Sequence, residues 1–154
     1  MMAGDREIFA GEFRSSHGRV LDRDLFFFLL DLEVKRARRY QNFLCLMLLK
    51  IKPFLKNDIQ EEKDTYGRIL SDILAEETRD SDIIGALEIN HLAVLLPYAD
   101  SKAGDHVKSR FENTLRYYDF KDREFEVVFD QLCFPIHGAD TMDLIKRALN
   151  SGPS

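Results

Sequence analysis

The spacing of apolar residues along this chain predicts helices in four stretches. In each, apolar residues recur three or four positions apart, which is the spacing of one buried face of an α-helix. The clearest stretch has its apolar residues at i, i+3, i+4, i+7 and i+8, and these are Tyr66, Ile69, Leu70, Ile73 and Leu74. The predicted helices span residues 22–40, 65–77, 101–117 and 140–149.

Shorter stretches between these helices predict β-strands. Residues 43–51 form a continuous apolar run, which is typical of a strand buried on both faces in the middle of a sheet. Residues 79–97 predict a hairpin that ends at Pro97, and residues 124–134 alternate in the manner of a partly exposed strand. Residues 52–64 are polar and contain a proline, which predicts a loop.

The order of these elements is helix, strand, helix, hairpin, helix, strand and helix. That order predicts an α+β fold in which an antiparallel sheet of about four to five strands is flanked by helices. The length of 154 residues is enough for one domain with a substantial core. With 45% hydrophobic and 32% charged residues, the composition is that of a globular protein rather than a disordered one.

Charge and hydropathy exclude several classes of function. The net charge of -5 and the isoelectric point near 5.4 argue against a protein that binds nucleic acid through its phosphates. No apolar run approaches the length of a membrane span, so no membrane partner is expected. The first residues lack a basic stretch followed by an apolar one, and we therefore expect a cytoplasmic protein.

The cysteines and histidines give no metal-site pattern. Cys45 and Cys133 both lie in apolar strand-like runs, which predicts buried, reduced thiols rather than a disulfide or a metal pair. The histidines show no spacing typical of metal ligands, and they are His17, His91, His106 and His137. We expect no metal and no other cofactor.

The predicted hairpin carries the most informative residues. Its second strand is an apolar run ending in Leu-Pro, and an arginine and an aspartate precede its first strand. This frame resembles the signature hairpin of the GGDEF (diguanylate cyclase) family, whose turn reads Gly-Gly-Asp/Glu-Glu-Phe. In this chain the five signature positions hold Glu88, Ile89, Asn90, His91 and Leu92.

The resemblance extends over most of the chain. Three further segments match family segments in order and spacing, and they span residues 33–40, 46–54 and 131–140. The resemblance implies the palm-like fold of nucleotide cyclases, with a degenerate GGDEF domain at residues 21–150. Residues 1–20 then form a leader or connector, and residues 151–154 form a tail.

The family's metal positions are altered in this chain. In the family, acidic groups from the first strand and from the signature turn hold divalent metal at the triphosphate of GTP. The strand positions are Lys50 and Lys52, and an ammonium group repels Mg²⁺ instead of binding it. The turn position is Asn90, a weaker ligand, and the adjacent catalytic glutamate is His91.

Other positions that contact GTP in the family also differ. The two turn glycines are Glu88 and Ile89, which bring a charge that repels phosphate and a β-branched side chain that disfavours positive φ. A family arginine is Ala86, while the residues that hold guanine correspond to Asn57 and Asp64 across a shortened loop. We predict that the domain is not an enzyme. One alternative is that Lys50 and Lys52 hold a nucleotide without metal.

The family's inhibitory site is preserved in spacing. Active members carry R-x-x-D followed by five residues and the signature turn, and this site binds the product cyclic di-GMP. In this chain Arg79 and Asp82 are followed by residues 83–87 and then Glu88. A further family arginine, from the helix after the hairpin, corresponds to Arg110.

The chemistry of these residues suits guanine, because an arginine fork donates to O6 and N7 while a carboxylate accepts from N1 and N2. The alternative is that Arg79 pairs with Asp80 or Asp82 at the surface and that Asp82 only starts the strand. The sequence therefore predicts a regulatory module that responds to cyclic di-GMP. Two further readings are a protein-interaction or dimerisation domain without a nucleotide, whose partners are other signalling domains or a second copy, and a residual cyclase.

Overall fold

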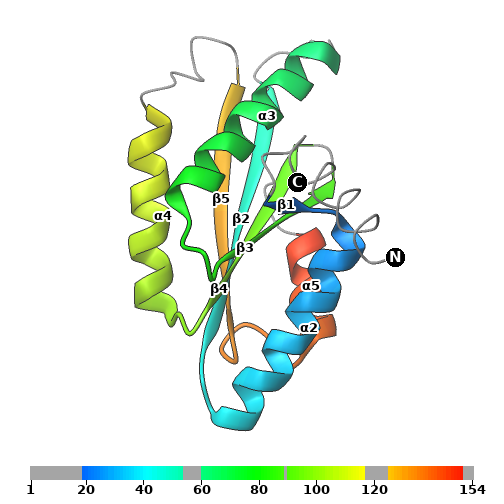
Figure 1. Ribbon diagram of the computed structural model, residues 1–154, viewed down its shortest axis with the longest axis vertical. Coiled ribbons are helices and arrows are strands. Elements are labelled where there is room, and N and C mark those ends of the chain that lie inside the picture. Colours follow the sequence, from blue (N-terminus) through cyan, green and yellow to red (C-terminus); the bar gives the residue numbers. More distant parts are fainter. Residues whose placement is uncertain (1–18, 54–59, 89, 117–124, 151–154) are drawn as a thin grey trace, which may run out of the picture.

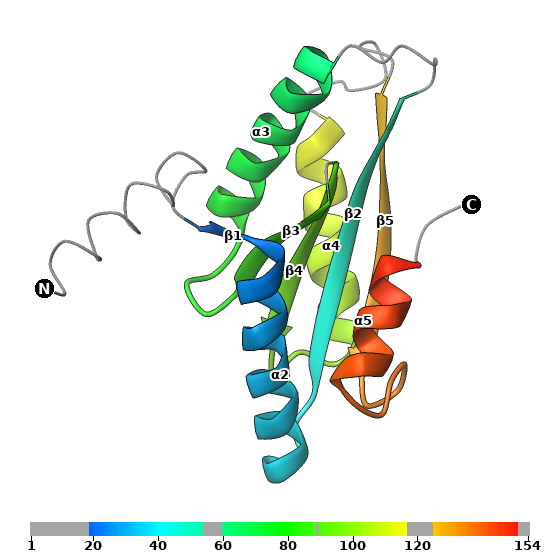
Figure 2. The ribbon, with the colours of Figure 1, turned by 90° about the vertical axis from the view of Figure 1, so that its right-hand side faces the viewer.

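One five-stranded sheet organises the residues that the computed structural model describes, which are 19–53, 60–88, 90–116 and 125–150. The strands lie side by side in the order β1-β3-β4-β2-β5. Helices α3 and α4 cover one face of the sheet, and α2 and α5 cover the other (Figures 1 and 2). The elements are β1 (Val20–Leu21), α2 (Arg23–Tyr40), β2 (Leu44–Pro53), α3 (Gln60–Glu77), β3 (Ile83–Glu88), β4 (His91–Pro97), α4 (Ser101–Arg116), β5 (Phe125–Phe134) and α5 (Thr141–Leu149).

Strand β2 lies inside the sheet, between β4 and β5. Its side chains alternate between two hydrophobic clusters, so that Cys45 and Met47 pack beneath α3 and α4 whereas Leu46 and Leu48 pack beneath α2 and α5. An apolar run buried on both faces is the pattern of an interior strand. The prediction of a central strand here is confirmed.

The helices bury the faces that their periodicity predicts. Leu70, Ile73 and Leu74 of α3 are buried in the first cluster, and Phe26 and Leu30 of α2 are buried in the second. Three helices begin at an aspartate whose carboxylate accepts a bond of 2.9 Å from the backbone N–H three residues further on. These aspartates are Asp22, Asp100 and Asp140. Among the helices described, none is long and apolar enough to cross a bilayer.

The boundaries differ from prediction around the segment that was expected to be a loop, residues 52–64. Strand β2 continues to Pro53, where it still pairs with β5, and α3 already begins at Gln60. The first residues of α3 are polar and carry no apolar stripe, so periodicity does not detect them. Residues 54–59, which include Asn57, lie outside the described part.

The sheet also contains a strand that the pattern did not predict. Strand β1 has two residues and pairs in parallel with β3, with Val20 opposite Ile84 and Leu21 opposite Gly85. All other neighbouring strands are antiparallel, as predicted. Two residues are too few to show an alternation. The predicted leader and tail fall mostly outside the described residues.

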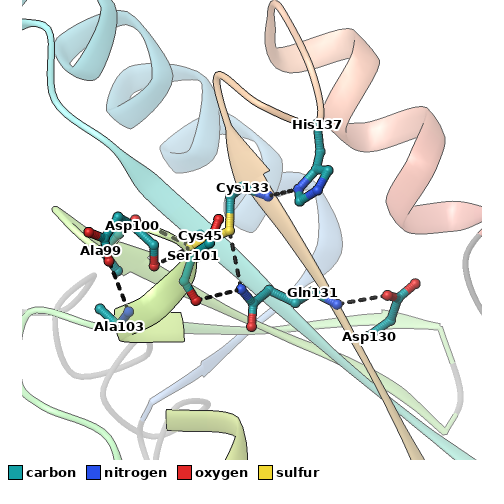
Figure 3. Close-up of a disulfide and its surroundings, with 9 residues drawn as sticks. All are labelled: Cys45, Ala99, Asp100, Ser101, Ala103, Asp130, Gln131, Cys133 and His137. Carbon is teal, nitrogen blue, oxygen red and sulfur yellow. Dashed lines mark hydrogen bonds between the residues drawn. A yellow bond between two sulfur atoms is a disulfide. The ribbon is translucent and has the colours of Figure 1, made fainter. Parts of the chain in front are cut away.

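The prediction of reduced cysteines is wrong. The structure joins Cys45 of β2 and Cys133 of β5 in a disulfide (Figure 3). The two residues lie directly opposite each other in the β2–β5 ladder, and opposite residues on one face of a sheet are close neighbours. Each cysteine by itself has the sequence context of a core residue, and only the strand register reveals the pair. Gln131 Nε2 donates to Cys133 Sγ over 3.3 Å beside the bridge.

Candidate functional site

The signature turn connects β3 to β4 and is the first candidate site. Glu88 ends β3 and lies opposite His91, the first residue of β4. Asn90 has a positive φ of 65°, a conformation that asparagine tolerates better than most residues. Its backbone oxygen accepts a 2.8 Å bond from the N–H of Ile51, which fixes the turn against β2. Ile89 lies outside the described residues.

His91 is buried and poorly matched to its surroundings. It is 1% exposed, and neither ring nitrogen has a hydrogen-bond partner among the described residues. Lys50 lies directly opposite it on β2, so both side chains leave the sheet on the same face. Burial lowers the pKa of His91, and the charge of Lys50 lowers it further, while Glu88 acts in the opposite direction. These influences together favour the neutral form of the ring.

These residues do not fit a magnesium–triphosphate site. Hard divalent cations require oxygen ligands, and the structure places a lysine and a buried imidazole opposite each other on β2 and β4, beside the turn. Lys52, on the same side of β2, lies opposite Glu126 of β5. In the described part of the chain, no three His, Cys, Asp or Glu side chains gather closely enough to hold a metal ion.

The second candidate site is the loop between α3 and β3. Asp82 accepts from the backbone N–H of Arg79 at 2.8 Å and from its guanidinium at 3.2 Å. The Asp82 side chain is 1% exposed, whereas that of Arg79 is 62% exposed. The pairing of Arg79 with Asp82, considered in the sequence as an alternative to ligand binding, is therefore present. The Asp82 carboxylate holds both the backbone N–H and the guanidinium of Arg79, and its burial leaves it little surface for a ligand.

Arg110 approaches the same loop from α4. It donates to the backbone oxygen of Glu77 at 2.9 Å and lies 3.5 Å from the Glu77 carboxylate. Thr114, one turn further along α4, donates to the same carboxylate at 3.2 Å. Arg110 is thus bound to Glu77, which precedes Arg79 by two residues, and the Arg110 side chain stays 49% exposed.

A third arginine, Arg19, contacts this loop and was not predicted. Its guanidinium donates to the backbone oxygens of Arg79 and Asp82 at 2.6 and 2.9 Å, and to Thr78 Oγ1 at 2.7 Å. Sequence reasoning placed residue 19 in a leader outside the domain. No local pattern marks an arginine that acts on residues about sixty positions away. The residues corresponding to the family's guanine-holding pair, Asn57 and Asp64, cannot be located, because neither side chain belongs to the described part.

Comparison with known proteins identifies the fold. No protein-family model matches the chain, and no curated protein matches its sequence. Among solved structures, a DGC protein from Thermotoga maritima has 21% identity and a TM-score of 0.69, covering 86% of this chain and 92% of that one. The GGDEF domain of DgcB from Caulobacter crescentus, in complex with c-di-GMP, has 13% identity and a TM-score of 0.65, covering 85% and 80%.

A third similar structure contains a partner protein. Diguanylate cyclase SiaD from Pseudomonas aeruginosa, in complex with its activator SiaC, has 16% identity and a TM-score of 0.64. The match covers 97% of this chain and 60% of that one. Together these similarities show that the chain has the GGDEF-domain fold, as the hairpin resemblance predicted.

Proposed function

We propose that this chain is a non-catalytic regulatory domain of the GGDEF type, which binds cyclic di-GMP at the loop between α3 and β3. The observation that carries the proposal is the pair formed by Lys50 and the buried His91 at the signature turn. A fixed positive charge beside a neutral imidazole cannot grip the magnesium ions that GTP cyclisation requires. The domain therefore keeps the fold for a purpose other than catalysis.

The arginines near the start of β3 suit cyclic di-GMP as the ligand. Cyclic di-GMP presents two phosphates and two guanine bases, which a guanidinium recognises through paired N–H donors. Arg79 and Arg110 both expose about half of their side chains or more, and each guanidinium is held by a carboxylate, that of Arg79 by Asp82 and that of Arg110 by Glu77. An anchored arginine loses less conformational entropy on binding than a free one. Arg79 and Arg110 contact the ligand, and Asp82 orients Arg79.

The ligand is tested by titrating cyclic di-GMP into the protein in a calorimeter. We expect saturable heat for the wild-type protein and a loss of affinity of about a hundredfold for Arg79→Ala, because charged hydrogen bonds are among the strongest in such interfaces. Arg39→Ala is the matched control, since Arg39 is exposed on α2 and stacks on Tyr40. Absence of heat from the wild-type protein at saturating ligand would refute nucleotide binding.

The loss of catalysis is tested separately. The protein is incubated with GTP and Mg²⁺, and the mixture is separated by chromatography to detect cyclic di-GMP. We expect no more product than in a protein-free control. Product formation that depends on the protein would overturn the non-catalytic reading and restore the interpretation as a residual cyclase.

A second candidate function is protein interaction without any nucleotide. Phe28 and Leu32 lie one turn apart on α2 and are 60% and 44% exposed, so they form an apolar strip on the side away from the sheet. Such a strip suits a helix of another signalling domain or of a second copy. Under this reading, Phe28→Glu abolishes a partner complex or a dimer seen by light scattering, and the Arg79→Ala variant behaves as wild type.

A further inference from the structure

Arg19 contacts five oxygen atoms at one end of α3. Its Nη1 lies 3.1 Å from the Ala75 backbone oxygen, 3.4 Å from that of Thr78 and 2.7 Å from Thr78 Oγ1. Its Nη2 donates to the backbone oxygens of Arg79 at 2.6 Å and Asp82 at 2.9 Å. The terminal nitrogens of the guanidinium are therefore committed to holding the main chain of residues 75–82.

The C-terminus of α3 needs a cation from elsewhere in the fold. The helix ends in Glu76 and Glu77, and its last turn contains no basic residue. Acidic side chains at the negative end of a helix dipole are unfavourable, and the final carbonyl groups lack partners within the helix. Arg19 and Arg110 both donate to these carbonyl groups. A residue from outside the helix thus supplies the charge that its own sequence lacks.

The position of Arg19 links the loop to the sheet. The residue directly precedes β1, whose pairing with β3 fixes its backbone. Strand β3 begins at Ile83, immediately after Asp82. The bond between Arg79 and Asp82 lies within the loop and does not attach it to the rest of the domain. Arg19 makes that attachment, because it bonds to the end of the helix and to the last loop residue at once.

We propose that Arg19 is the positioning residue of the ligand loop: it holds residues 78–82 in the conformation that presents Arg79. This inference rests on the proposed function for the ligand itself, although the positioning of the loop is independent of it. A lysine cannot replace this arginine, because one ammonium group does not span acceptors that two separate nitrogens now reach. The start of the domain is thereby connected to a site sixty residues later in the chain.

Hydrogen exchange in the absence of ligand tests the positioning. The reporter amides are those of Arg79 and Asp82, which bond within the loop, and the β2 amides serve as an internal reference for global stability. In Arg19→Gln and Arg19→Lys we expect the reporter amides to exchange at least about tenfold faster, with the β2 amides unchanged. Arg39→Gln is the control and leaves both sets unchanged. Wild-type exchange of the reporter amides in both Arg19 variants would overturn the proposal.

Titration with cyclic di-GMP then separates this inference from the proposed function. If Arg19 presents Arg79, both Arg19 variants weaken binding by about tenfold, whereas Arg39→Gln does not. Faster loop exchange with undiminished affinity would show that loop geometry does not govern the site and would overturn the inference. If the wild-type protein binds no cyclic di-GMP, the proposed ligand is wrong, and the exchange of the reporter amides still decides whether Arg19 positions the loop.

Discussion

The two candidate sites lie at opposite ends of one strand and are built in opposite ways. The ligand loop, residues 78–82, leads into β3, and the signature turn follows it at Glu88. The six residues of β3 separate them by about 17 Å at the usual rise of an extended strand. In the loop, the buried carboxylate of Asp82 bonds to Arg79. At the turn, the buried ring of His91 has no hydrogen-bond partner among the described residues.

This difference shows what each site is able to do. Buried polar groups that find their partners hold a single arrangement, whereas an unmatched polar group costs free energy without specifying a geometry. The loop therefore has the fixed geometry that recognition requires. The turn keeps a hairpin shape, but the buried ring of His91 has no matching partner in the described part of the chain. Four measurements distinguish the two regions.

The largest expected effect comes from removing the buried carboxylate of the loop. Asp82→Ala leaves the N–H of Arg79 without its acceptor and deletes a side chain that is 1% exposed. We expect a loss of about 2–3 kcal/mol in the free energy of unfolding, measured by urea denaturation. Asp80→Ala is the matched control, because Asp80 is exposed in the same loop. Equal free energies of unfolding for Asp82→Ala and Asp80→Ala would show that the buried carboxylate does not stabilise the loop.

The opposite change is expected at the turn. His91→Leu replaces a buried ring that has no hydrogen-bond partner among the described residues with an apolar side chain of similar size. Removal of an unsatisfied buried polar group is favourable, and we expect a gain of about 1 kcal/mol in the free energy of unfolding. A loss of stability of comparable size would mean that the imidazole makes an important polar contact in the folded protein.

The turn also predicts a pH dependence. Burial and Lys50 lower the pKa of His91 below its ordinary value of 6.5, with Glu88 opposing. Between that value and the lower folded pKa, the unfolded state binds more protons than the folded state. The penalty for burying this ring is therefore smallest above pH 6.5 and grows as the pH falls, so that the free energy of unfolding declines. Denaturation of wild type and His91→Leu at several pH values measures this. We expect the free energy of unfolding to change less steeply with pH in His91→Leu than in the wild-type protein. The control is His106→Ala, which changes an exposed histidine and is expected to keep the wild-type slope.

The features that the sequence predicted and those that it missed differ in how far apart in the chain their residues lie. Periodicity located each of the described helices and the interior strand β2, because a stripe of buried residues such as Leu70, Ile73 and Leu74 is a local signal. The hairpin and the spacing between Arg79 and the turn are also local, and they led to the correct fold. Such local signals do not reveal which distant segments of the chain contact each other.

The features that were missed depend on strand register or on contacts between distant segments. Cys45 meets Cys133 only through the pairing of β2 with β5, across 88 positions. Arg19 meets the loop only because β1 lies beside β3. The burial of Asp82 could not be read from an Arg-x-x-Asp spacing, since the same spacing is compatible with an exposed carboxylate. The sequence therefore predicts which residues are candidates, and the fold determines their roles.

The smallest expected effect distinguishes anchoring from recognition at Arg110. The Arg110–Glu77 pair is half exposed on its cationic side, and solvent screens such pairs strongly. Arg110→Met keeps an unbranched apolar side chain and removes the charge, together with the guanidinium that lies over the Phe111 ring. We expect a loss of no more than about 0.5 kcal/mol in urea denaturation, together with a clear loss of cyclic di-GMP affinity in calorimetry. A large loss of stability with unchanged affinity would assign Arg110 to the scaffold, leaving Arg79 to recognise the ligand by itself.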